Sequence, residues 1–212
     1  MMSAAVSCKR GRKAGCPAAL MQVLGQVELT VDYRPSSDLQ KVSNISAAAT
    51  WTDMPYSPIK ASMSIFLADF LYHCLKGEGE NAVLFSFLDN SLRWFDEAVG
   101  GYANFHLILM LRLTRFLGIW PTLEGWAPGK FYDLKGACYS SRLPDHGQYL
   151  CADDARWVPL LLHTDYGTMH RLRLTRDKRW HMLDILLQYY RLHVPAFGEL
   201  QSLDVLRELF AG

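Results

Sequence analysis

The sequence predicts a mainly α-helical protein that begins with a short β segment. Residues 22–33 alternate apolar and polar side chains from Val27 onward, which is the pattern of a half-buried strand. Three apolar stripes with helical spacing follow between residues 57 and 118, and glycines separate them. A further long helical pattern runs from Thr175 to His193. Helices joined by short connections favour a bundle.

The composition indicates a folded, soluble chain. Half of the 212 residues are hydrophobic and 12% are aromatic, which is enough for a core and excludes disorder of the whole chain. The net charge is +1, so any binding of a polyanion must come from local clusters of charge. No apolar run reaches the roughly 18 residues of a membrane span, and the start has no signal-peptide pattern.

The five cysteines form no CxxC pair. This argues against a disulfide framework and against a thiolate metal site. Reduced thiols in a cytoplasmic protein are the simpler interpretation.

A β hairpin is expected in the first domain, residues 1–52. Arg34 and Pro35 open a turn with the chemistry Arg-Pro-Ser-Ser-Asp. Residues 39–45 then form a return strand, so the two strands pair as a hairpin.

Three helices are expected at the start of the second domain, residues 53–212. Ser57 is a good N-cap, and Pro58 suits the first helical position because its missing N–H has no partner there. The three predicted apolar faces are, in order, Ile59, Met63, Phe66, Leu67, Phe70, Leu71 and Cys74; Val83, Leu84, Phe87, Leu88, Leu92 and Phe95; and Phe105, Ile108, Leu109, Leu113, Phe116 and Leu117.

The rest of the second domain is predicted to be an irregular loop followed by more helices. The loop covers about residues 118–150 and is rich in Gly, Pro, Tyr and Ser. A helix is expected near residues 153–163, shortened or kinked by Pro159. The helix from Thr175 to His193 follows, and Ser202 caps a last short helix that ends at Phe210.

Four segments, in this order, resemble the RecO family of DNA-repair proteins, particularly those of Bacteroides-like bacteria. They are Val31-Asp32-Tyr33-Arg34-Pro35 with Asp38-Leu39-Gln40, Pro55 to Tyr72, Asn104 to Pro121, and Gln188 to Pro195 with Leu200 to Leu203. The resemblance implies an OB barrel followed by a helical domain, which sometimes carries a zinc finger. It also implies a protein that binds and anneals DNA. With RecR, it would load RecA onto strands coated by single-stranded-DNA-binding protein.

Two departures from the family pattern stand out. An OB barrel needs five strands, and only about one hairpin precedes the helices here. The segment from Ser7 to Lys13 resembles the basic loop in the middle of that barrel, so we expect an incomplete OB fold that lacks its first strands. A fragment or a late start codon would explain it. Where zinc-bearing relatives place a Cys₄ finger, only Cys138 and Cys151 remain.

The predicted nucleic-acid site is a cluster of cations near the N-terminus: Lys9, Arg10, Arg12 and Lys13. No carboxylate occurs before Glu28, and such clusters bind phosphates without sequence preference. The resemblance adds Arg34. The alternative is a solvated tail.

A second basic stretch opens the long C-terminal helix and is the predicted partner or phosphate contact: Arg171, Arg173, Arg176, Lys178 and Arg179. Cations near a helix N-terminus are opposed by the macrodipole, so they do not serve that helix end. They could take phosphate or, by the resemblance, the acidic C-terminal tail of single-stranded-DNA-binding protein. The alternative is a solvated face balanced by Asp165, Asp177 and Asp184. A bound peptide would need a groove, for which Phe105, Leu109, Trp180 and Leu183 are candidate walls.

Metal binding and catalysis are not expected. Cys138, His146, Cys151 and His163 are spaced 8, 5 and 12 residues apart, without the close ligand pairs of structural zinc sites. No nucleophile or phosphate-loop motif is present. Asp153 and Asp154 suit the dipole at a helix start. The tryptophans could stack on bases, but packing is the more usual role. The sequence thus predicts a DNA and protein adaptor without enzymatic activity or cofactor. The alternative is a helical protein-binding module without DNA affinity.

Overall fold

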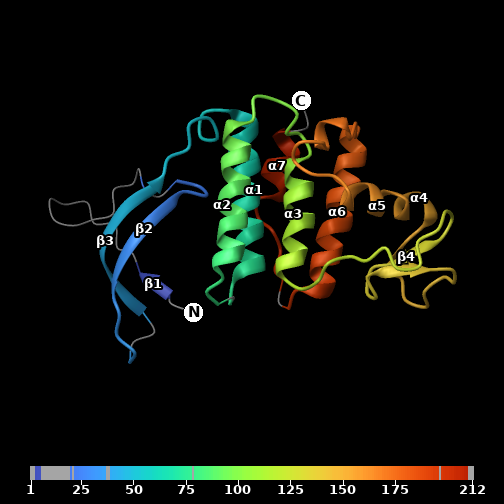
Figure 1. The fold of residues 1–212 in the computed structure, drawn as a ribbon, viewed down its shortest axis with the longest axis horizontal. Coiled ribbons are helices and arrows are strands. Elements are labelled where there is room, and N and C mark those ends of the chain that lie inside the picture. The colour runs from blue at the N-terminus through green and yellow to red at the C-terminus, as the bar shows by residue number, and fades with distance from the viewer. Residues whose placement is uncertain are drawn as a thin grey trace. The chain divides into compact units, whose positions relative to one another are not determined.

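The computed structural model describes residues 3–5, 20, 22–36, 39–77, 79–195 and 197–209. These residues belong to two compact units, one of Met1–Glu97 with Leu200–Gly212 and one of Ala98–Glu199. Figure 1 shows the elements of both units. The predicted domain boundary near residue 53 falls inside the first unit and stays a prediction.

The first unit begins with a three-stranded sheet. Strands β1 (Ser3–Ala5), β2 (Gln26–Asp32) and β3 (Leu39–Ala49) lie in the order β1-β3-β2. Strand β2 pairs antiparallel with β3, so the predicted hairpin is confirmed (Figure 1). In the described part of the chain this sheet has fewer strands than the five of an OB barrel, as the sequence predicts.

Helices α1 (Pro58–Leu75), α2 (Ala82–Glu97) and α7 (Leu203–Leu209) complete the first unit. Ser57 stands at the N-cap position of α1 and Pro58 follows at its first position, as predicted, but the Ser57 hydroxyl makes no capping hydrogen bond. Most of the predicted apolar face of α1 is buried, although Ile59 is exposed. In α2, Val83 is exposed as well, because both residues lie in the first turn of their helices, where few neighbours can cover them. Ser202 precedes α7, but its hydroxyl donates to Asp69 of α1 at 2.8 Å.

The carboxylate of Asp96 ties the segment after β3 to the end of α2. It accepts hydrogen bonds from the backbone N–H groups of Thr52, Asp53 and Met54 at 2.7–2.9 Å and from the Thr52 hydroxyl at 2.8 Å. Burial alone would raise the pKa of Asp96, but these hydrogen bonds lower it overall. The buried ammonium of Lys60 donates to the Asp96 carbonyl and pairs with the Asp53 carboxylate, both at 2.7 Å. This network fixes how α1 starts against the end of α2.

The second unit is built on helices α3 (Phe105–Phe116) and α6 (Arg176–His193). Both were predicted within a few residues, and Thr175 caps α6 by accepting from the Lys178 N–H. Nine of the twelve residues of α3 are buried, so its core face is wider than the predicted stripe. The buried Tyr190 hydroxyl donates to the Met110 carbonyl at 2.6 Å and holds the two helices together.

Residues 118–150 contain a second small sheet, which the sequence did not predict. Strands β4 (Phe131–Asp133), β5 (Cys138–Ser140) and β6 (Tyr149–Leu150) lie in the order β5-β4-β6. Strands of two or three residues are too short to show an alternating pattern. Aromatic side chains stabilise them instead, since the Tyr132 and Tyr139 rings meet edge to face at 4.9 Å.

The helix expected near residues 153–163 is two short helices, α4 (Ala152–Ala155) and α5 (Trp157–Leu162). Pro159 is the reason, because it has no N–H to donate to the Ala155 carbonyl. That carbonyl instead accepts from the Tyr139 hydroxyl at 2.6 Å. The shortening attributed to Pro159 is therefore confirmed, and the freed carbonyl joins α4 to the small sheet.

Candidate partner and nucleic-acid site

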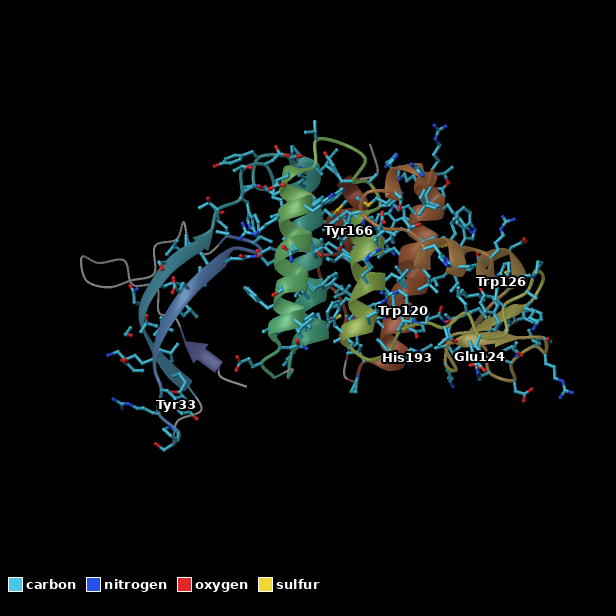
Figure 2. All side chains as sticks on the ribbon, viewed as in Figure 1. Tyr33, Trp120, Glu124, Trp126, Tyr166 and His193 are labelled. Atoms are coloured by element: carbon cyan, nitrogen blue, oxygen red, sulfur yellow. The ribbon has the colours of Figure 1, made fainter. Side chains whose placement is uncertain are left out.

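The predicted nucleic-acid residues Lys9, Arg10, Arg12 and Lys13 lie outside the described residues. Arg34 is described and is exposed in the turn between β2 and β3. The buried Gln40 side chain shapes this turn, because its amide accepts from the Arg34 N–H at 2.7 Å and donates to the Arg34 carbonyl at 3.0 Å. Tyr33, the residue before Arg34 in the sequence, is 63% exposed near the end of the hairpin (Figure 2). This end of the hairpin thus exposes one cation and one aromatic ring.

Some cations of the second basic stretch make hydrogen bonds or salt bridges within the second unit, and the others face solvent. The Lys178 ammonium pairs with the Asp154 carboxylate at 2.8 Å and lies 5.3 Å from the centre of the Trp157 ring. The half-buried Arg179 donates to the Asn104 side chain at 2.9 Å and to the Leu174 carbonyl at 3.2 Å. Burial lowers the pKa of Arg179. Both side chains therefore help to hold the second unit together.

Arg171, Arg173 and Arg176 are exposed, and none of them pairs with a carboxylate of the described residues. Leu172 and Leu174 alternate with the first two arginines and are buried. Two tight turns shape this segment, since the Arg173 N–H donates to the Arg171 carbonyl at 3.0 Å and the Leu174 N–H donates to the Leu172 carbonyl at 2.9 Å. In this conformation the two leucines are buried and the two arginines are exposed.

The buried side chain of Asn104 fixes the backbone of this segment. It donates to the Leu172 carbonyl at 2.7 Å and to the Met169 carbonyl at 3.4 Å. Its carbonyl oxygen accepts from Arg179. The arginines are therefore displayed from a main chain held in one conformation.

A surface hollow of about 400 Å³ lies beside Arg171 and Arg173. It lies between α5 and the segment that contains the short 3-10 helix η2 (Met169–Arg171). The hollow combines apolar, hydroxyl and cationic side chains, and its walls are Trp157, Leu160, His163, Thr164, Thr168, Arg171, Leu172 and Arg173. Leu160 is 48% exposed and leaves an apolar surface open at one side of the hollow.

Local hydrogen bonds hold the residues that line the hollow in place. His163 Nδ1 lies 2.6 Å from the Pro159 carbonyl, and the Thr164 hydroxyl donates to the Leu160 carbonyl at 2.7 Å. Asp165 accepts from the backbone and the hydroxyl of Thr168, both at 2.7 Å. These hydrogen bonds lower the pKa of Asp165. The Asp165 carboxylate therefore stabilises the turn at residues 165–168.

The predicted groove walls were wrong. Phe105, Leu109 and Leu183 are buried in the core, and only Trp180 is partly exposed. The walls of the hollow beside Arg171 and Arg173 come instead from α5 and the 164–173 segment, most of which was not predicted to take part in binding. A usable signal was the alternation of arginine and leucine over residues 171–174, with the Trp157–Leu160 segment close by in the sequence.

Asp165, Asp177 and Asp184 were expected to balance the charge of the basic stretch, but among the described residues it is Asp154 that forms a salt bridge with it. This residue binds both Lys178 and, at 2.7 Å, His181. Burial would raise the pKa of Asp154, but these two partners lower it overall. Asp153 and Asp154 lie in the first turn of α4, as predicted.

The four side chains considered for zinc have other neighbours. His146 lies 3.3 Å from the Asp133 carboxylate, and His163 binds the Pro159 carbonyl. Cys138 lies opposite Asp133 in the pairing of β5 with β4. Cys151 follows β6, which pairs with the other edge of β4. In the described residues, no three His, Cys, Asp or Glu side chains are grouped as metal ligands would be. The donor set therefore does not fit a zinc finger.

None of the helices in the described part of the chain is both long enough and apolar enough to cross a membrane.

Comparison with known proteins shows the family of this chain. Residues 56–203 match the family model described as recombination protein O C terminal. A DNA repair protein RecO of Phocaeicola vulgatus is 42% identical over 97% of this chain and 86% of its own length. One of Bacteroides fragilis is 39% identical, over 97% and 85% respectively. One of Porphyromonas gingivalis is 30% identical, over 96% and 84%. The chain therefore belongs to the RecO family of DNA repair proteins.

Proposed function

We propose that this chain is a recombination mediator that makes and breaks no covalent bond. It binds single- and double-stranded DNA, anneals strands and helps to load RecA onto single-stranded DNA. Its direct partners are DNA, RecR and the C-terminal tail of single-stranded-DNA-binding protein, and RecA is reached indirectly. It needs no cofactor and works in the bacterial cytoplasm, at the nucleoid during repair. The family membership supports the DNA-repair role.

The observation that supports the partner contact best is the hollow beside Arg171 and Arg173. Two exposed guanidinium groups offer strong donors to carboxylates. Trp157, Leu160 and Leu172 offer apolar surface in the same hollow. A ligand that matches both is a short peptide with acidic residues next to apolar ones. The acidic tail of single-stranded-DNA-binding protein is such a peptide.

The proposed DNA contact uses Lys9, Arg10, Arg12 and Lys13 together with the hairpin turn. Arg34 would neutralise a phosphate, and the exposed Tyr33 ring offers a surface on which a base can stack. Binding of this kind follows the backbone and is indifferent to sequence.

A second candidate function is a protein-binding module without DNA affinity. The observation that favours it is that the hollow and its arginines lie wholly in the second unit. The proposed DNA residues all belong to the first unit. Either activity could therefore be lost without the other.

Binding of labelled single-stranded DNA, measured by fluorescence anisotropy at several salt concentrations, tests the DNA role. If each phosphate contact releases a counterion, log affinity falls linearly with log salt. Replacing Lys9, Arg10, Arg12 and Lys13 by Glu should remove most of the affinity. If the wild-type chain binds no DNA, or binds it without dependence on salt, the DNA role is contradicted.

A labelled acidic tail peptide tests the partner role independently. We expect the double variant Arg171→Glu with Arg173→Glu to weaken peptide binding at least tenfold, because it places two repelling charges beside the ligand. Arg191→Glu is a matched control, since Arg191 is exposed in the same unit but lies near the other end of α6. Equal losses in both variants would mean that only net charge matters, and the hollow would not be the binding site.

A further inference from the structure

Helix α1 carries apolar side chains on its exposed side as well as on its buried side. Ile65 is 40% exposed and Tyr72 is 60% exposed. Pro58 is exposed, and Ala61, Ala68 and Leu75 are partly exposed. These six residues are named the α1 stripe. An apolar stripe along a helix normally packs against another element, yet the residues of the α1 stripe are exposed or partly exposed in the first unit.

The spacing of the α1 stripe is that of a seam between two packed helices. Its members follow one another at intervals of three, four, three, four and three residues. This alternation is the 3.5-residue repeat by which one helix packs its side chains between those of another. The occupant that fits the α1 stripe is therefore another helix.

We propose that the occupant is α1 of a second copy of this chain, packed antiparallel. In an antiparallel seam each residue of the first repeat position faces one of the second position on the other helix. Ile65 then faces Ala68 of the second copy, Tyr72 faces Ala61, and Pro58 faces Leu75. Both central layers join a large side chain to an alanine, so the seam fills evenly. A parallel pair would set Tyr72 against Tyr72 and alanine against alanine, which leaves clashes and gaps.

A hollow in the first unit lies where this arrangement needs one. It has a volume of about 320 Å³ and is lined by Gln22, Val23, Met54, Pro55, Ala61, Ser64 and Ile65. Ala61, which would face Tyr72 of the second copy, is part of its wall. Val23 is 47% exposed at this site. An aromatic side chain inserted into such an apolar pocket is a common anchor of a protein interface. Two-fold symmetry provides the contact twice.

The exposed apolar area predicts a weak dimer. Tyr72, Ile65, Val23 and the two prolines leave each copy a few hundred Å² of exposed apolar surface, so a pair lies below or near the ~1,000 Å² limit of specific interfaces and belongs with the weak ones. We therefore expect a dissociation constant in the micromolar range.

Sedimentation equilibrium of the full chain tests the proposal. Between about 1 and about 200 µM, we expect the average mass to rise from one copy towards two. Tyr72→Ala and, separately, Ala68→Glu should keep the chain monomeric over this range. Tyr56→Ala is the matched control, because Tyr56 is 79% exposed but lies outside the α1 stripe. Unchanged melting temperatures would show that the variants are folded.

Cross-linking tests the orientation. A mixture of Ile65→Cys and Ala68→Cys chains should form a disulfide-linked pair on oxidation well above the level of either chain alone or of wild type. Equal cross-linking in the unmixed samples would contradict the antiparallel arrangement. A wild-type chain that stays monomeric leaves the α1 stripe to another partner and overturns the proposal, as does a dimer that Tyr72→Ala does not weaken.

Discussion

The ammonium of Lys60, on the first turn of α1, lies 2.7 Å from the carbonyl oxygen of Asp96 near the end of α2. The same ammonium pairs with the Asp53 carboxylate at 2.7 Å, while the Asp96 carboxylate accepts four further hydrogen bonds. A lysine that is 0% exposed is tolerated only because both acceptors are in place. The first unit therefore depends on a buried polar network where its strands lead into its helices.

Removing the Asp96 carboxylate should destabilise the chain strongly. Asp96→Ala leaves three backbone N–H groups without their acceptor, and we expect the free energy of unfolding to fall by about 3 kcal/mol. Urea denaturation followed by circular dichroism measures this. Arg93→Ala is the control, because the Arg93 side chain is about half exposed and its i,i+4 pair with Asp89 contributes under about 0.5 kcal/mol. A loss below about 1 kcal/mol for Asp96→Ala would contradict the importance of the network.

His106 should make the stability of the protein depend on pH. Burial, followed by the nearby charge of Arg179, lowers the pKa of His106 from 6.5 to about 3. In the unfolded chain the ring takes up a proton below about pH 6.5, while the folded chain stays unprotonated until far lower pH. The free energy of unfolding should therefore decrease as pH falls below 6.5, by up to about 1.4 kcal/mol per unit.

Denaturation curves between about pH 6.5 and about pH 4 test this, since in that window the lowered pKa values of Asp96 and Asp154 keep both carboxylates charged. His106→Gln, which cannot titrate, should flatten the slope. His170→Gln is the matched control, because His170 is exposed. The same slope in wild type and in His106→Gln would show that other groups cause the dependence.

Asn104 should affect peptide binding although it does not line the hollow, because it holds the backbone that carries Arg171 and Arg173. Its amide holds the Leu172 carbonyl at 2.7 Å and the Arg179 side chain at 2.9 Å. We expect Asn104→Ala to lower the free energy of unfolding by about 1–3 kcal/mol, because buried partners lose their hydrogen bonds. It should also weaken binding of the acidic peptide several-fold, because the backbone that displays Arg171 and Arg173 is released. Asn104→Ala with wild-type peptide affinity would mean that the neighbouring packing alone positions the arginines.

The Tyr139 hydroxyl should contribute measurably to the small sheet. It donates to the Ala155 carbonyl at 2.6 Å. Tyr139→Phe keeps the ring but leaves this carbonyl without a donor, so we expect a loss of about 1 kcal/mol in the free energy of unfolding. Tyr149→Phe serves as the comparison, because Tyr149 is only partly buried and contacts Phe131 through its ring. Equal stability of Tyr139→Phe and wild type would show that water or another donor replaces the hydroxyl.

The elements that were predicted well from the sequence are those whose apolar pattern repeats over many consecutive residues. Helix α6 shows its period over eighteen residues with a threonine cap, and strand β2 alternates over seven. The small sheet escaped prediction because its strands are too short to alternate, and its stability comes from contacts such as that between Tyr139 and Ala155.

The candidate site could be predicted only in part, for a similar reason. The cluster of charge pointed to Arg171 and Arg173 as candidates, but the walls of a hollow depend on which apolar residues stay exposed after packing. Phe105 and Leu109 have the helical spacing of core residues, and the core is where they lie. Leu160 has no sequence signal that sets it apart from its buried neighbour Leu161.

Trp157 lines both the hollow beside the arginines and a separate apolar pocket of about 40 Å³. Its indole nitrogen is buried and makes no hydrogen bond within the described residues, and the Lys178 ammonium lies over its ring. The emission of an indole responds to such surroundings, so the protein carries its own optical reporter at this site. Occupation of the hollow can be followed by the fluorescence of a variant in which the other five tryptophans are phenylalanine, without a label on either binding partner.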